Sequence, residues 1–169
     1  MITHKHRRLE DEEVQQALSF LNDATSVETL ALKGHLFVEY WLNEAILEHL
    51  NGTQEFLETL NFHQKCLLAK AIKLVEKDDF YDHLSVINQI RNRFAHTLFP
   101  KNIEELISKL PLQKKDAEGK FLPPVEILRG NLVMLFVVLT LSQAPKEYRA
   151  QVVKELIDPI QHTKRNSSR

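Results

Sequence analysis

Apolar residues recur every three to four positions along almost the whole chain, and this spacing predicts α-helices. Glycine and proline are rare and fall mostly between the apolar stretches, where they are expected to end helices. No convincing stretch alternates between apolar and polar residues as a half-buried strand would. The predicted helices are 9–22, 26–50, 63–77, 82–99 and 124–143, with shorter or weaker ones at 54–60, 102–109 and 146–157. The pattern therefore predicts an all-α bundle of about five to seven helices.

The segment 26–50 predicts a long helix that is apolar on almost every side. Ser26 is a suitable N-cap residue, and the Asn-Gly pair at 51–52 is expected to end the helix. Gly34 lies inside it, where a glycine lowers helix stability, so we expect Gly34 to mark a close approach between two helices. Glu39 lies among leucine and isoleucine positions of this helix and therefore predicts a cationic partner.

A second helix, predicted to end before Pro100, contains the stretch INQIRNRFAH at 87–96. On a helical wheel its core side carries Leu84, Ile87, Ile90, Phe94 and Leu98, and its other side carries Ser85, Asn88, Asn92 and His96. Arg91 falls on the apolar side, so it must reach solvent or pair with an anion, and Glu39 is its predicted partner. Arg91 and His96 point about 140° apart on an ideal helix. A site that uses both needs the length of arginine, a loosened last turn or a second subunit.

The length of 169 residues fits one domain, predicted at 1–162, with a polar and disordered tail at 163–169. The formal net charge is −1, so any basic surface must be local. The single cysteine, Cys66, lies in an apolar run and is expected to be a small core residue in a reducing compartment. The charged N-terminus is unlike a secretory signal, and the most apolar stretch, from Asn131, is too short to span a bilayer. These features predict a cytoplasmic protein without membrane contact.

Arg91, Asn92 and His96 form the pattern Arg-Asn-x-x-x-His, and on these residues the chain resembles the HEPN superfamily of all-α domains. The upstream stretch GHLFVEYWLNEAILEHL is similar to the family's earlier long helix, which often carries an acidic residue near the motif. Glu39 matches that acidic residue best. The resemblance covers 26–100 well and the later helices only as generic α-helices, and it implies a single-domain bundle of HEPN type.

The resemblance implies a metal-independent endoribonuclease, of the toxin or defence kind, in which two copies bring their motifs together across a cleft. In this interpretation His96 transfers protons, Arg91 stabilises charge on the phosphate, and Asn92 and Glu39 support them. Cleavage by the 2′-hydroxyl would leave a 2′,3′-cyclic phosphate. Further contacts to RNA are expected from Asn88, Arg93, Lys114 and Lys115, the last two in the long loop 110–124. The expected partners are a second copy, RNA, and an antitoxin or regulatory protein.

An alternative interpretation is that the motif residues are structural. Arg91 and Glu39 would then form a buried ion pair, and Asn88, Asn92 and His96 a polar seam between helices or subunits. The chain would act as a non-catalytic dimerisation or regulatory module, in transcription or in a stress response. No cofactor or metal is predicted, because His35 and Glu39 are one turn apart but spacing places no third ligand beside them.

Overall fold

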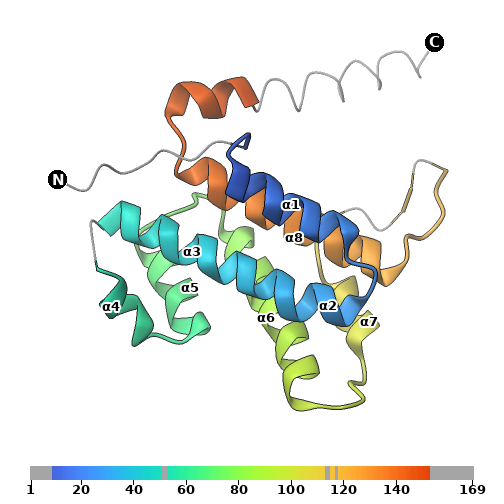
Figure 1. The fold of residues 1–169 in the computed structure, drawn as a ribbon. Helices are drawn as coiled ribbons and strands as arrows, with labels where there is room; N and C mark the ends of the chain where they lie inside the picture. Colours follow the sequence, from blue (N-terminus) through green and yellow to red (C-terminus); the bar gives the residue numbers. More distant parts are fainter. Residues whose placement is uncertain (1–8, 51–52, 113–114, 117, 153–169) are drawn as a thin grey trace, which may run out of the picture.

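Two apolar helices pack against each other at the centre of the molecule, α3 (His35–Leu50) and α8 (Pro124–Ser142). Their sides meet through Trp41 and Phe136, both almost fully buried, whose ring centroids are 5.3 Å apart with the rings nearly perpendicular. In the computed structural model, which describes residues 9–50, 53–112, 115–116 and 118–152, helix α1 (Glu12–Asp23) lies over α8 and alongside α3 (Figure 1). The hydrophobic core therefore lies between α1, α3 and α8 and extends toward the remaining helices.

The segment predicted as one helix at 26–50 is continuous but contains a π-helical turn. It consists of α2 (Val27–Thr29), a π-turn at Leu30–Gly34 and α3. Ser26 is the N-cap, as predicted, and its Oγ accepts a 3.0 Å hydrogen bond from the backbone N–H of Thr29. The close approach expected at Gly34 is confirmed, because a Cβ atom there would lie 2.6 Å from Cδ1 of Leu132 on α8.

Four helices form the other side of the bundle: α4 (Gln54–Glu58), α5 (Phe62–Ala71), α6 (Asp78–His96) and α7 (Ile103–Ser108). Helix α5 packs against both α3 and α6, and α7 lies between α6 and α8 (Figure 1). Helix α5 ends earlier than predicted, and Lys73, two residues beyond its last residue, adopts the left-handed conformation with φ 53°. Helix α6 begins at Asp78, four residues before the predicted start at 82, so Asp82 lies inside the helix.

The all-α prediction is confirmed for the described residues. Eight α-helices lie entirely within them, one more than the predicted range, because the π-turn separates α2 from α3. Residues 146–152 are also helical, in agreement with the predicted helix at 146–157, whose last residues lie outside the described part. The elements pack into one helical body. The predicted tail at 163–169 lies outside the described residues as well.

Helix α8 is longer than the apolar stretch that begins at Asn131, since it starts at Pro124. Within the described part of the chain it is the one helix long and apolar enough to cross a membrane by length and composition. Seven of its residues are buried in the bundle: Leu128, Asn131, Leu132, Leu135, Phe136, Leu139 and Thr140. In this structure its apolar side serves as a central part of the core.

Candidate functional site

Helix α6 orients the motif because one side of the helix is fixed in the core. The residues predicted to face the core are buried or half-buried: Leu84, Ile87, Ile90 and Phe94. The prediction that Leu98 shares this side is wrong, because α6 ends at His96 and Leu98 is 87 % exposed. The C-terminal end of the motif helix therefore projects from the core into solvent.

Arg91 is half-buried and binds its neighbour in the sequence. Its Nη1 donates a 2.9 Å hydrogen bond to Oδ1 of Asn92. The predicted ion pair between Arg91 and Glu39 is wrong: among the described residues the Glu39 carboxylate is bound by Lys65, whose Nζ lies 2.7 Å from Oε1. A guanidinium has more N–H donors than the bond to Asn92 uses, so Arg91 retains donors for an anion such as a phosphate.

Lys65 is a site residue that the sequence analysis missed. It lies on α5 and is only 6 % exposed, although it carries a charge. Phe62 and Ala69, one turn away on either side, are both buried. A lysine on the apolar side of an amphipathic helix predicts an anionic partner, and this is the signal that could have identified it. Its ion pair with Glu39 joins α5 to α3.

His35 completes a buried polar cluster, which we define as His35, Glu39 and Lys65. The His35 ring packs on Phe62 with 4.3 Å between ring centroids, and its Nδ1 is 3.8 Å from Oε2 of Glu39. Burial lowers the pKa of His35 to about 4, which outweighs the opposite effect of the Glu39 carboxylate. The charge of Arg91 lowers this pKa further, so the guanidinium lies within electrostatic range of the cluster. His35 is therefore neutral at neutral pH.

Asn88 lies between the motif and the buried polar cluster. It is half-buried, and it is close enough to the His35 ring to favour the protonated form of that ring, without the geometry of a full hydrogen bond. The predicted role of Asn88 as a contact for RNA therefore competes with a role inside the bundle.

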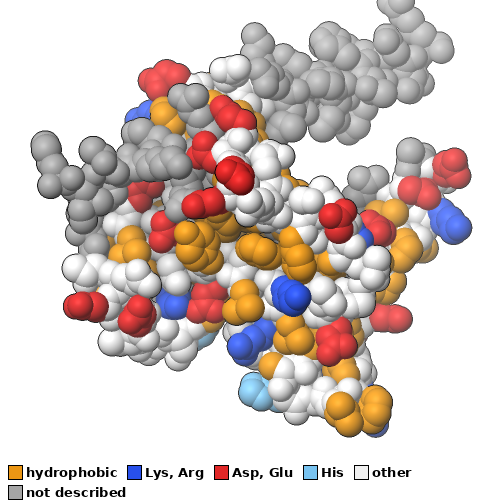
Figure 2. All heavy atoms as spheres, viewed as in Figure 1, with side chains coloured by type: hydrophobic (Ala, Val, Ile, Leu, Met, Phe, Trp, Pro, Cys, Tyr) orange, Lys and Arg blue, Asp and Glu red, His pale blue; other side chains and the backbone are white. Residues whose placement is uncertain are grey.

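His96 and Arg93 occupy the exposed last turn of α6. Positive or polar residues at this end of a helix interact favourably with its dipole. In the described part of the chain no hydrogen bond or ion pair joins Arg91 to His96. Figure 2 shows hydrophobic side chains gathered across α1 and α3, with Lys, Arg and His side chains beside them over the C-terminal half of α6.

The described residues of the loop 110–124, namely 110–112, 115–116 and 118–124, lie at the side of the molecule, away from the C-terminal end of α6 (Figure 1). Lys115 is exposed, and its ammonium group lies 4.8 Å from the centre of the Phe121 ring in the same loop. Lys114 lies outside the described residues. The structure therefore separates Lys115 from Arg91 and His96.

A thiol and several potential metal ligands also lie in this region. Cys66 is buried, as predicted, and burial raises the pKa of its thiol to about 12, so it remains protonated. The residues that the structure describes contain no group of three or more His, Cys, Asp or Glu side chains placed to hold a metal ion.

No protein-family model matches this chain, and neither does any curated protein or solved structure. The resemblance to HEPN domains therefore depends on the motif and on its position after a long helix. The geometry itself provides a half-buried arginine bound to an asparagine, an exposed histidine at the end of the same helix, and a buried polar cluster behind them.

Proposed function

We propose that this chain is an RNA-binding domain of HEPN type and a metal-independent endoribonuclease whose site is composed from two copies. The observation that supports this most is the arrangement of α6, where Arg91 is held by Asn92 and His96 is exposed at the helix end. A fixed cation and an imidazole that can accept and donate a proton suit phosphate transfer to a 2′-hydroxyl.

In the proposed reaction the 2′-oxygen forms a bond to phosphorus while the bond from phosphorus to the next 5′-oxygen breaks. The 2′-hydroxyl proton passes to a base, and the departing 5′-oxygen receives a proton. His96 carries out proton transfer, and Arg91 stabilises the charge on the phosphate oxygens. The products are a 2′,3′-cyclic phosphate and a 5′-hydroxyl.

A second copy supplies the geometry that one copy lacks. Arg91 and His96 of one chain point about 140° apart, so they do not converge on one phosphate. Two motif helices that face each other allow Arg91 of one copy to work with His96 of the other. A homodimer is thus part of this proposal, as are a toxin or defence role in the cytoplasm and an antitoxin or regulatory protein as a further partner.

The test is incubation of the purified protein with structured RNA in the presence of EDTA. We expect cleavage that leaves 2′,3′-cyclic phosphate ends, and its loss in Arg91→Ala and in His96→Ala. His63→Ala is the matched control, because His63 is an exposed histidine on α5. No cleavage by the parent protein, or cleavage that survives both motif substitutions, would contradict the proposal.

A second candidate function is a non-catalytic dimerisation or regulatory module. The bond between Glu39 and Lys65 favours it, because the acidic residue associated with the motif here holds α5 against α3 instead of binding Arg91. For this function we expect dimers with no ribonuclease activity, and dimers weakened by substitution of Asn92 or His96.

A further inference from the structure

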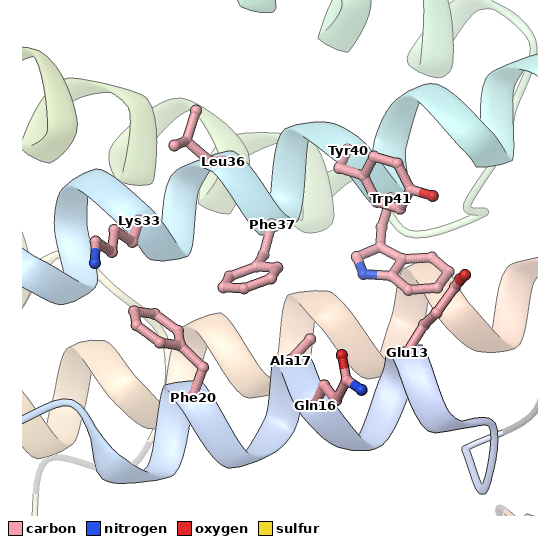
Figure 3. Close-up of a pocket in the computed structure, with 9 residues that line it drawn as sticks. All are labelled: Glu13, Gln16, Ala17, Phe20, Lys33, Leu36, Phe37, Tyr40 and Trp41. Carbon is pink, nitrogen blue, oxygen red and sulfur yellow. The ribbon is translucent and has the colours of Figure 1, made fainter.

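A groove of about 690 Å³ runs along the surface between α1 and α3 (Figure 3). Its lining is apolar and largely aromatic: Ala17, Phe20, Leu36, Phe37, Tyr40 and Trp41. Leu36 is 59 % exposed and Tyr40 is 47 % exposed, so two large side chains stand in solvent along its edge. A contiguous apolar surface with an aromatic centre is typical of a protein–protein interface.

The groove carries opposite charges at its two ends. Helices α1 and α3 run in opposite directions along it. Lys33, in the π-turn just before α3, lies near Phe20 of α1, and Glu13 of α1 lies near Trp41 of α3 (Figure 3). The Lys33 ammonium is 5.7 Å from the centre of the Phe20 ring. The surface therefore has a cationic end, an apolar centre and an anionic end.

We propose that this groove binds the same groove of a second copy about a two-fold axis. A two-fold contact places one patch against itself in the reverse direction. The α3 helices of the two copies then run antiparallel and face each other, so the exposed Leu36 and Tyr40 of each copy pack against the partner's α3. Lys33 of each copy meets the partner's Glu13. A surface with one charge at each end and an apolar centre is complementary to itself only in this orientation.

The same axis places the two motifs on one side of the dimer. The C-terminal end of α6 lies to one side of α3, and Leu36 points from α3 toward that side, away from α1 (Figures 1 and 3). An axis at right angles to α3 within the interface keeps the α6 ends of both copies on the same side of α3. Both motif helices then lie along the same edge of the dimer. This consequence rests on the proposed function, since it identifies the surface that would assemble the composite site.

The first test is the oligomeric state of Leu36→Asp by analytical ultracentrifugation, without RNA. We expect the parent to be dimeric at micromolar concentration and the substitution to raise the dissociation constant at least about tenfold. Leu67→Asp is the matched control, because Leu67 is 55 % exposed on α5 and does not line the groove. A parent that is monomeric at about 100 µM, or a Leu36→Asp protein that dimerises like the parent, would overturn the proposal.

The second test uses the charges at the ends of the groove. Lys33→Glu places glutamates at both ends, so we expect it to weaken the dimer, and we expect Lys33→Glu combined with Glu13→Lys to restore it. If the double variant dimerises no more tightly than Lys33→Glu alone, the antiparallel arrangement is overturned. A dimer that passes both tests but cleaves no RNA would contradict the ribonuclease alone and leave the interface established.

Discussion

Lys65 donates a 2.7 Å hydrogen bond to Glu39 and so connects α5 to α3 through a pair of charges with little access to solvent. The lysine side chain is 8 % exposed and the glutamate side chain 27 % exposed. Two charges in such a place require each other, because either one alone would lack a counter-ion in a medium of low polarity. The pair also limits what Glu39 can do for the motif on α6.

Lys65→Met is expected to lower the free energy of unfolding by about 2 to 3 kcal/mol, since it leaves Glu39 without its cation. Glu39→Met in addition should recover most of this loss, because both charges are then absent. Chemical denaturation of the three proteins measures both effects. Lys109→Met is the control: Lys109 pairs with Glu105 at 3.3 Å on the exposed surface, and its loss should cost less than about 0.5 kcal/mol.

Gly34→Ala and Gly130→Ala are expected to have opposite effects on stability. A Cβ at Gly34 would lie 2.6 Å from Cδ1 of Leu132, which is fully buried and has little room to move, so we expect a loss of about 1 kcal/mol. A Cβ at Gly130, in the middle of α8, has no atom within 4 Å, so the higher helix propensity of alanine should stabilise by about 0.5 to 1 kcal/mol. Thermal denaturation of both variants measures these changes in stability. Equal changes in the two variants would show that α8 does not closely approach the π-turn at Gly34.

His35 predicts a loss of stability in mild acid. Its pKa is lowered to about 4 in the folded state from 6.5, so below about pH 6.5 the unfolded chain binds a proton that the folded chain does not. The contribution of neutral His35 to the stability of the folded state is therefore complete above pH 6.5, and it decreases as the pH falls toward 4. Between pH 7 and pH 5 we expect a loss of about 2 kcal/mol from this residue. Urea unfolding of the parent and of His35→Leu at both values tests it, and an equal pH dependence in the two proteins would contradict it.

Mixing the Arg91→Ala and His96→Ala proteins tests whether two copies share one site. Neither protein alone can form a complete site, whereas a mixed dimer contains one site with both residues intact. Random exchange makes about half of the dimers mixed, so we expect about a quarter of the parent ribonuclease activity to return. If no ribonuclease activity returns in a mixture shown to exchange subunits, Arg91 and His96 of the same chain form the site.

The sequence predicted the helices well where a buried face and a clear terminal signal agree. Ser26 as the N-cap and Gly34 as a close contact follow from local chemistry, and both are confirmed. The start of α6 was predicted at 82, but the helix begins at Asp78 after Lys77, whose side chain makes no capping hydrogen bond, so no cap signal marks the true start. Leu98 fits the helical wheel, but the helix ends two residues before it.

The partner of Glu39 could not be obtained from the helix that carries it. The wheel correctly indicated a glutamate in need of a cation, and Arg91 was chosen because it is a cation on the apolar side of its own helix. The partner is Lys65, because α5 packs beside α3 and brings a buried lysine to the carboxylate. Which of two cations reaches an anion depends on the packing of helices that are distant in the sequence, and periodicity contains no information on that.

The π-turn at Leu30–Gly34 changes how this chain has to be aligned with other helical proteins. A π-turn holds one residue more than an α-turn, so the residues after Gly34 are rotated by about 100° relative to a regular helix. An alignment without a one-residue gap in this turn assigns either the residues before it or those after it to the wrong face. A distant relative whose long helix is regular would therefore match the first half or the second half of 26–50, but not both in one register.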